Sequence, residues 1–352
     1  MILLKADGEQ MGIIIAIIVF SFIVIFHELG HFTLAKLNGI EVEEFCLGFG
    51  PTLVGKEFKG TKFSLKLLPF GGACIMGEDE AEDLKENSFN SKSVWARISV
   101  VAAGPIFNFI LALILSVILV LAVGYDEPVL GDVTEGYPAQ EQGLQAGDRI
   151  IKINGSRVHM WKDVSMYNML HQGKTIDVVY ERDGEQKEVT ITPKQDENGN
   201  YFYGFIGTGK QTKANLLTAV QYGNYTVQYM VKYAVGSLKL LLTGKVGIKD
   251  MSGPVGMVEV MDQTYKASSS GGAGLVALNF LNIAILLSAN LGVMNLLPIP
   301  ALDGGRLVFL IIEAIRKKRI PPEKEGYVHM AGMVLLMVLM VVIMISDVIK
   351  LF

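Results

Sequence analysis

Four apolar stretches divide the chain, and each is long enough to cross a lipid bilayer. A transmembrane helix needs about 20 mainly apolar residues. Runs of this length lie at about 12–34, 97–123, 275–297 and 328–346. The first run is longer than the apolar region of a cleavable signal peptide, and no small-residue cleavage site follows it. The hydrophobic pattern therefore predicts a polytopic α-helical membrane protein with four transmembrane helices.

The segment between the first two runs alternates between apolar and polar residues. Residues 63–68 alternate as a strand does, and Gly48 and Gly50 mark a turn. We predict a small membrane-associated β-sheet or hairpin. Two interpretations stay open for it. It is either a structural loop, or a clamp in which an edge strand carrying Leu65 and Leu67 holds an extended peptide. In the second case Gly48 and Gly50 are also predicted to bind the substrate.

Residues 126–209 have the pattern of a separate β-rich domain. Pro138 to Gly155 reads P-A-x-x-x-G-L-x-x-G-D-x-I-x-x-I-N-G, which closely resembles a PDZ domain. The pattern predicts a short helix, a strand at 150–153 and an Asn-Gly hairpin turn. PDZ domains bind extended peptides by strand addition, often at a free C-terminus. The sequence at 204–207 fits either the carboxylate-binding loop of such a domain or a plain terminal strand.

Residues 213–266 alternate apolar and polar groups and carry tyrosines near helical spacing. Tyrosine suits a membrane interface, so we predict helices that lie on the outer membrane surface. His159, His171 and His329 have no partner at metal-ligand spacing, and we interpret them as surface or incidental residues. Cys46 and Cys74 form no motif, and no role is predicted for them.

The predicted organisation follows from these patterns. In chain order it comprises transmembrane helix 1 at 11–36, a cytoplasmic-side β segment with an acidic loop at 37–94, transmembrane helix 2 at 95–124, an extracytoplasmic PDZ domain at 126–209, membrane-surface helices and a linker at 210–273, an interrupted transmembrane helix 3 at 274–317, and transmembrane helix 4 at 326–351.

Basic residues in two short segments orient these helices. Segments 36–97 and 316–324 are rich in Lys and Arg, and short cytoplasmic loops carry an excess of such residues. Four spans place both segments on one side, so 125–273 and both chain termini are predicted to lie outside a bacterial cytoplasmic membrane. The net charge of -4 in a chain that is 51% apolar gives no indication of a nucleic-acid partner.

The sequence H-E-L-G-H at 27–31 lies at the end of the first apolar run. On a helix, His27 and His31 share one face and can bind one metal ion, for which Zn²⁺ suits neutral imidazoles. Glu28 is the expected general base. About 15 residues at 1.5 Å each carry the pair roughly 22 Å into a core about 30 Å thick. Such groups are costly in lipid, so a functional site is the default interpretation.

A third metal ligand is predicted at the broken end of the third apolar run. Residues 295–305 read N-L-L-P-I-P-A-L-D-G-G, and a helix break at membrane depth is tolerated only where it is buried in protein or lines a cavity. Runs one and three both descend from outside to inside, so their ends lie at similar depth. Asp303 is the only carboxylate in this break, and the topology therefore predicts that it joins the histidines.

These features together resemble the site-2 protease family, and within it the bacterial regulator-of-sigma-E proteases in a form with a single PDZ domain. The motifs are H-E-L-G-H, N-x-x-P-x-P-x-x-D-G from Asn295, and the PDZ-like segment between runs two and three. The resemblance implies that His27, His31 and Asp303 bind zinc and that Glu28 is the catalytic base. It also implies that Asn295 binds the substrate or its oxyanion, and that 45–50 and 63–72 form a membrane-inserted hairpin and edge strand.

The predicted function is zinc-dependent cleavage of transmembrane segments in regulated intramembrane proteolysis. The expected partners are the bilayer and single-span membrane proteins already trimmed by another protease, for example anti-sigma factors or remnant signal peptides. The main alternative is a non-catalytic membrane scaffold that binds peptides through its PDZ domain. It leaves the histidines, Glu28 and Asp303 in lipid without a role. A zinc transporter is a further alternative, but the sequence offers no relay across the outer half of the membrane.

Overall fold

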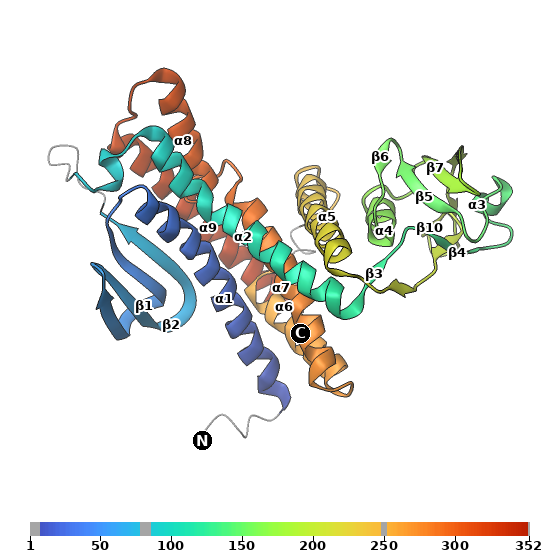
Figure 1. Cartoon of the computed structure of the whole chain (residues 1–352), viewed down its shortest axis with the longest axis horizontal. Coiled ribbons are helices and arrows are strands. Elements are labelled where there is room, and N and C mark those ends of the chain that lie inside the picture. The colour runs from blue at the N-terminus through green and yellow to red at the C-terminus, as the bar shows by residue number, and fades with distance from the viewer. Residues whose placement is uncertain (1–7, 78–85, 248–251, 351–352) are drawn as a thin grey trace. The chain divides into compact units, whose positions relative to one another are not determined.

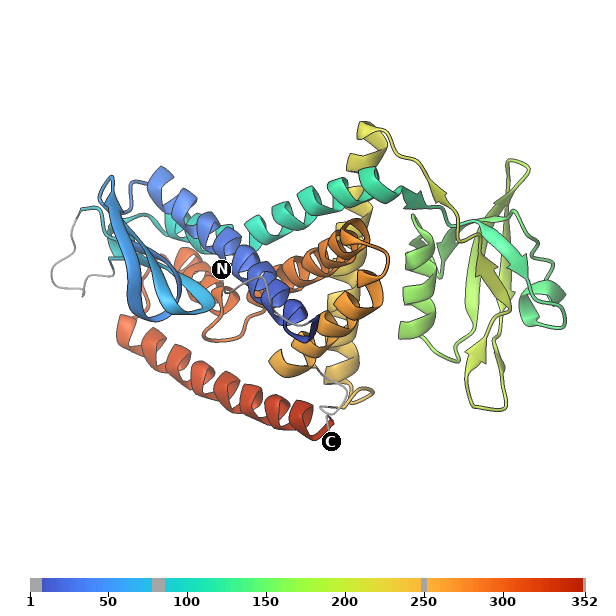
Figure 2. The ribbon, with the colours of Figure 1, turned by 90° about the horizontal axis from the view of Figure 1, so that it is seen from below.

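The computed structural model describes residues 8–77, 86–247 and 252–350. Most of the predicted acidic loop, 78–85, lies outside the described residues. The chain forms two compact units, residues 1–115 together with 244–352, and residues 116–243, and each unit is described by itself below (Figures 1 and 2).

Among the described residues, four helices are long and apolar enough to cross a membrane, and they coincide with the four predicted runs. They are α1 (Gly8–Leu37), α2 (Val94–Val123), α7 (Ala273–Asn295) and α9 (Pro322–Lys350). The first three pack together around Ile23, Leu111 and Ala284. Their long apolar runs suit a lipid environment, because a helix makes its backbone hydrogen bonds within one segment, although α2 carries Pro105 in its interior.

The predicted interruption in the third run appears as a turn between two helices. Helix α7 ends at Asn295, and α8 (Asp303–Arg316) begins at Asp303. Pro298 and Pro300 lie between them and remove backbone donors that a continuous helix would need. A side chain at Gly304 could not be accommodated, because its Cβ would lie 2.5 Å from the carbonyl carbon of Leu296. The turn is therefore tightly packed.

Strands β1 (Val42–Phe58) and β2 (Thr61–Met76) form an antiparallel hairpin in the segment where β structure was predicted. Lys59 and Gly60 turn the chain, both with positive φ. Gly48 and Gly50 also have positive φ, at a stretch where the pairing register shifts, so these glycines bend β1 at a bulge. Figures 1 and 2 show the hairpin beside α1.

Helix α6 (Pro254–Ser269) packs against the first half of α1 and against α7 through a cluster that contains Ala16, Met261 and Phe280. Its N-terminus is tied to the far end of α9, since Asp347 Oδ2 accepts hydrogen bonds from the backbone N–H groups of Gly253 and Gly256 at 2.8 and 2.9 Å. The predicted surface segment 210–273 is thus divided, and its second half belongs to the helical unit.

The unit 116–243 is built on a four-stranded sheet with the order β6-β5-β7-β8. The elements are β3 (Tyr125–Asp126), β4 (Leu130–Val133), α3 (Pro138–Glu141), β5 (Arg149–Ile153), β6 (Ser156–Arg157), α4 (Trp161–Leu170), β7 (Ile176–Arg182), β8 (Glu185–Ile191), β9 (Lys194–Gln195), β10 (Tyr201–Phe202), β11 (Phe205–Gly207), β12 (Gln211–Thr212) and α5 (Leu216–Leu242). β11 pairs with β4, so 204–207 includes a strand. The helix, strand and turns around Pro138 to Gly155 lie where they were predicted.

Helix α5 packs on this unit through its tyrosines. Tyr222 is buried against Met160 and stacks on Tyr125 with ring centroids 3.7 Å apart. Tyr225 stacks on His159 at 3.9 Å. The tyrosines predicted to sit at the membrane interface therefore pack on the β-rich unit, because stacked aromatic rings bury large areas of apolar surface.

Candidate metal centre

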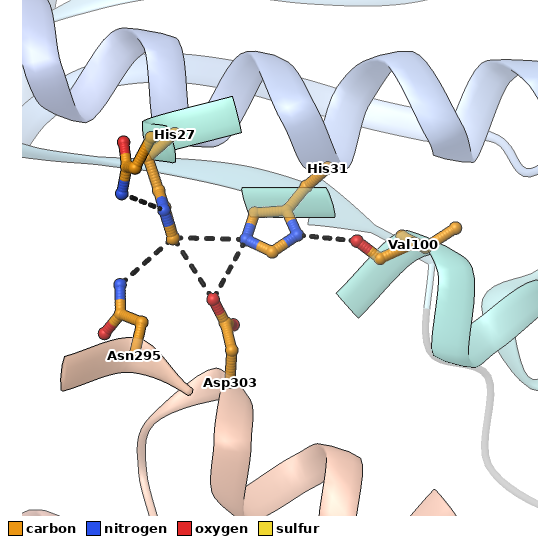
Figure 3. A network of polar contacts seen from close by, with 6 residues as sticks. His27, His31, Val100, Asn295 and Asp303 are labelled. Carbon is orange, nitrogen blue, oxygen red and sulfur yellow. Dashed lines mark hydrogen bonds and ion pairs between the residues drawn. The ribbon is translucent and has the colours of Figure 1, made fainter. Parts of the chain in front are cut away.

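Three predicted ligands from two helices converge on one point (Figure 3). Asp303 Oδ2 lies 3.2 Å from His27 Nε2 and 3.4 Å from His31 Nε2. The two imidazole nitrogens lie 3.2 Å from each other. His27 and His31 are 7% and 8% exposed. The spacing of i and i+4 on α1 brings the rings together, and the turn before α8 places Asp303 opposite them.

The donor set fits a zinc ion. Two imidazole nitrogens and a carboxylate oxygen are three of the four ligands that a catalytic zinc site uses, with one position left open. The three ligand atoms lie within 4.8 Å of one another. Asp303 Oδ2 is buried and accepts no hydrogen bond of acceptable geometry from the described residues. Two imidazole nitrogens and a carboxylate oxygen that face one point, each with a lone pair to offer, are the donors that a bound cation would use.

Helix α2 supports the rings from behind. His31 Nδ1 lies 2.9 Å from the carbonyl oxygen of Val100, and His27 Nδ1 lies 3.0 Å from Asn108 Nδ2. Gly104 lies midway between these two residues. A Cβ there would overlap His31 Nε2 and lie 2.7 Å from His27 Cε1. Glycine is required because the rings fill the space of a side chain.

Glu28 follows His27 on α1 and faces the hairpin. The backbone N–H of Cys74 donates a hydrogen bond to its carboxylate, and a Cβ at Gly72 would lie 3.2 Å from Glu28 Cγ. Strand β2 therefore passes directly beside the predicted base. Burial, with a smaller contribution from Glu28, raises the pKa of Cys74 to about 12, so this thiol is protonated near neutral pH.

The other predicted site residues lie at different distances from the centre. Asn295 ends α7, and its Nδ2 lies 3.4 Å from His27 Nε2. Leu65 and Leu67 are 41% and 52% exposed on β2. Gly48 and Gly50 lie at the bulge of β1. The positions of β2 that lie beside Glu28 are Gly72 and Cys74, further along the strand than Leu65 and Leu67.

Sequence reasoning gave too little weight to two residues. Gly104 was given no role in the metal site, yet it makes room for the imidazoles. Its spacing of four residues from Asn108 was the available signal, since it places both on one face of α2. His329 was interpreted as incidental, yet its Nδ1 accepts a hydrogen bond of 2.9 Å from the N–H of Ala301 in the turn before Asp303. No spacing in the sequence reveals that contact.

Comparison with known proteins gives the class of this protein. The model of peptidase family M50 matches residues 15–339. A protein of Clostridium acetobutylicum, named as a candidate zinc metalloprotease, is 40% identical over 338 residues, which cover 96% of this chain and 97% of the relative. The regulator of sigma-W protease RasP of Bacillus subtilis is 35% identical over 425 residues (97% of this chain, 99% of the relative). The zinc metalloprotease RasP of Bacillus licheniformis is 34% identical over 423 residues, with the same coverage.

The chain therefore belongs to peptidase family M50, the site-2 protease family. It is a zinc metalloprotease of a membrane-protein family, in agreement with its four long apolar helices. The predicted family, enzyme class and zinc cofactor are confirmed.

A solved PDZ domain of an SdrC-like protein from Listeria monocytogenes is 24% identical, with a TM-score of 0.22, and covers 24% of this chain and 90% of that chain. At this TM-score the PDZ assignment of 126–209 stays a prediction.

Proposed function

We propose that this protein is an intramembrane endopeptidase that cleaves transmembrane segments of single-span membrane proteins. The observation that carries the proposal is the convergence of His27 and His31, on a helix of membrane-spanning length, with Asp303 at the start of α8. A soluble peptidase has no need to place such a centre between apolar helices, where ionisable groups are costly. In this proposal the three residues hold zinc, which when bound acts as a Lewis acid and lowers the pKa of water.

Glu28 is proposed as the general base. It takes a proton from the attacking water and passes it to the leaving amine. Asn295 Nδ2, which lies beside His27, donates a hydrogen bond to the substrate carbonyl as negative charge develops on its oxygen. Strand β2 holds the substrate extended, because a peptide bond within a helix is shielded by its own hydrogen bonds. Gly72 and Cys74 lie beside Glu28, and Leu65 and Leu67 would hold more distant substrate residues.

The unit that contains residues 126–209 is proposed to be a PDZ domain on the outer side of the membrane, where it would admit substrates by size or by their free C-terminus. A cavity of about 350 Å³ supports this proposal. Aromatic residues and Asn168 line it beside Gly204. The basic segments at 36–97 and 316–324 would then face the cytoplasm, and both termini would lie outside. Substrates would be membrane proteins trimmed beforehand, such as anti-sigma factors or remnant signal peptides.

The test compares purified wild type with Glu28→Gln and Asp303→Asn on a model transmembrane substrate. Loss of a general base lowers the rate by about 10²- to 10⁴-fold, so Glu28→Gln is expected to be nearly inactive while its zinc content stays at the wild-type level. Asp303→Asn is expected to lower both zinc content and cleavage. Full cleavage by Glu28→Gln, or unchanged zinc affinity in Asp303→Asn, would remove that residue from its role. Deletion of 126–209 is expected to admit untrimmed substrates, and their continued exclusion would contradict the filter.

A further inference from the structure

Asn108 is buried without exposed surface in the middle of α2, directly behind one of the two histidines. Its side-chain amide lies 3.0 Å from His27 Nδ1. Its backbone carbonyl accepts a hydrogen bond of 2.8 Å from Ser288 Oγ of α7, which ties this part of α2 to α7. The amide oxygen Oδ1 is buried and accepts no hydrogen bond from the described residues. A polar group in this position needs an explanation.

The chemistry of the imidazole ring supplies one. A neutral histidine carries one proton, and a metal ligand must keep the lone pair of the coordinating nitrogen free. His27 presents Nε2 towards Asp303 and His31, so its proton belongs on Nδ1. The group facing Nδ1 must then accept a hydrogen bond. Asn108 is the side chain at that position, and Oδ1 is the only acceptor in its amide.

The other histidine, His31, has a partner at Nδ1 that can only be an acceptor. His31 Nδ1 faces the carbonyl oxygen of Val100 at 2.9 Å, and a carbonyl oxygen can only accept. Val100, Gly104 and Asn108 are spaced four residues apart and form one stripe along α2. This stripe gives each ring its partner and leaves space for both rings between the partners. His27 differs only because its partner is an amide, which can present either its oxygen or its nitrogen.

We propose that Asn108 is a positioning residue that presents Oδ1 to His27 Nδ1–H and thereby directs the Nε2 lone pair to zinc. The proposal rests on the ligand set proposed above. A half-turn of the amide exchanges Nδ2 and Oδ1 within the same space, because the two atoms are nearly identical in size. With the nitrogen towards Nδ1, the ring proton would occupy Nε2, the atom that faces Asp303. With the oxygen there, both histidines offer zinc the same nitrogen.

Two substitutions of Asn108 separate this role from simple packing. Asn108→Asp keeps the shape and can only accept, so zinc affinity is expected to stay at or above the wild-type level. Asn108→Leu keeps the volume without an acceptor. It is expected to weaken zinc binding by about 10- to 100-fold, the usual effect of losing such a partner of a metal ligand. Ser116→Ala, which removes another fully buried polar group of α2, serves as the matched control.

The measurements are the zinc dissociation constant by chelator competition, the visible spectrum of the Co²⁺-substituted protein, and the melting temperature without metal, all on the full chain in detergent. We expect Asn108→Leu to lose zinc affinity and shift the Co²⁺ bands, while its metal-free melting temperature matches that of Ser116→Ala. Wild-type affinity in Asn108→Leu would overturn the proposal. A loss of zinc affinity in Asn108→Asp as large as in Asn108→Leu would also overturn it. If Asn108→Leu does not fold, Asn108→Asp alone decides, because a loss of zinc affinity in that variant contradicts the proposal. His27→Ala tests the ligand set itself, because unchanged zinc affinity in that variant would contradict the proposed function rather than the role of Asn108.

Discussion

The N–H of Ala301 donates a hydrogen bond of 2.9 Å to Nδ1 of His329, and this contact ties the turn before Asp303 to helix α9. Ala301 has a φ of 75°, a left-handed conformation that costs a non-glycine residue about 1–2 kcal/mol. The hydrogen bond therefore holds a strained turn whose next helix begins with a proposed zinc ligand. The position of α9 is in this way linked to the geometry of the metal centre.

Replacing His329 by Ala is expected to loosen this turn. An exposed hydrogen bond contributes about 1 kcal/mol net, so zinc affinity should fall by about fivefold if the turn must be ordered to present Asp303. His329→Asn is the matched variant, since an Asn oxygen can replace Nδ1 as acceptor, and it should retain most of the affinity. Zinc titration and hydrogen exchange at 296–302 provide the measurements. Equal behaviour of the Ala and Asn variants would show that the hydrogen bond does not hold the turn.

The space at Gly104 leads to a second prediction. A methyl group at this position would overlap His31 and press on His27, and overpacking of this kind costs about 1–3 kcal/mol. Gly104→Ala should therefore lower zinc affinity by about 5- to 100-fold and reduce cleavage with it. Gly326→Ala in α9 is the control, because a Cβ there meets nothing within 4 Å. It should leave zinc binding unchanged. A Gly104→Ala protein that binds zinc as tightly as the control would contradict this steric requirement.

The sequence was sufficient to predict the parts of the site that depend on local spacing. The spacing of His27 and His31 is a property of one helix, and the prolines before Asp303 predict a break within one segment. The ends of the first and third apolar runs are predicted to lie at similar depth in the membrane, and this was enough to predict that Asp303 joins the histidines. Long apolar runs predict membrane helices well, since a helix makes its backbone hydrogen bonds within one segment, as lipid requires.

Contacts between distant segments could not be predicted in this way. The hydrogen bond between Ala301 and His329 depends on how α9 packs. The position of β2 beside Glu28 depends on the bulges of the hairpin, which shift the register by single residues. The tyrosines of α5 have the composition of a membrane-interface helix, yet packing on Met160 and Tyr125 takes precedence. The composition of a helix shows that its surface can be buried, but it does not show whether lipid or another part of the protein covers that surface.

A buried ion pair fixes the other end of α8. Arg97 of α2 is 5% exposed and pairs with Glu313 through its two terminal guanidinium nitrogens, with Nη1 to Oε2 at 3.2 Å. Removing one partner of such a pair leaves a buried charge and costs about 3–5 kcal/mol. Glu313→Gln should therefore clearly lower the melting temperature of the purified protein. The double variant Arg97→Met with Glu313→Leu should recover most of this loss, because no unpaired charge remains. A double variant less stable than Glu313→Gln would contradict this account.

The stacking of His159 on Tyr225 predicts a pH dependence of the unit 116–243. Burial lowers the pKa of His159, and the nearby cations Lys232 and Arg157 lower it further, while Asp163 opposes them. In the unfolded chain the imidazole takes up a proton at a pH of about 6.5. Below that value the unfolded state binds more protons than the folded state, so stability falls as the pH falls. Above it, His159 is neutral in both states and makes no pH-dependent contribution.

Hydrogen exchange of the amides at 156–163 and 222–229 should therefore become faster between pH 7.5 and pH 5.5, after correction for the intrinsic exchange rate. His159→Phe keeps an aromatic ring on Tyr225 but cannot take up a proton, so its protection should be independent of pH over this range. If the Phe variant loses protection with the same slope as wild type, another group controls the contact. A wild-type protein with constant protection down to pH 5.5 would show that the stacked ring is charged as readily in the folded state as in the unfolded chain.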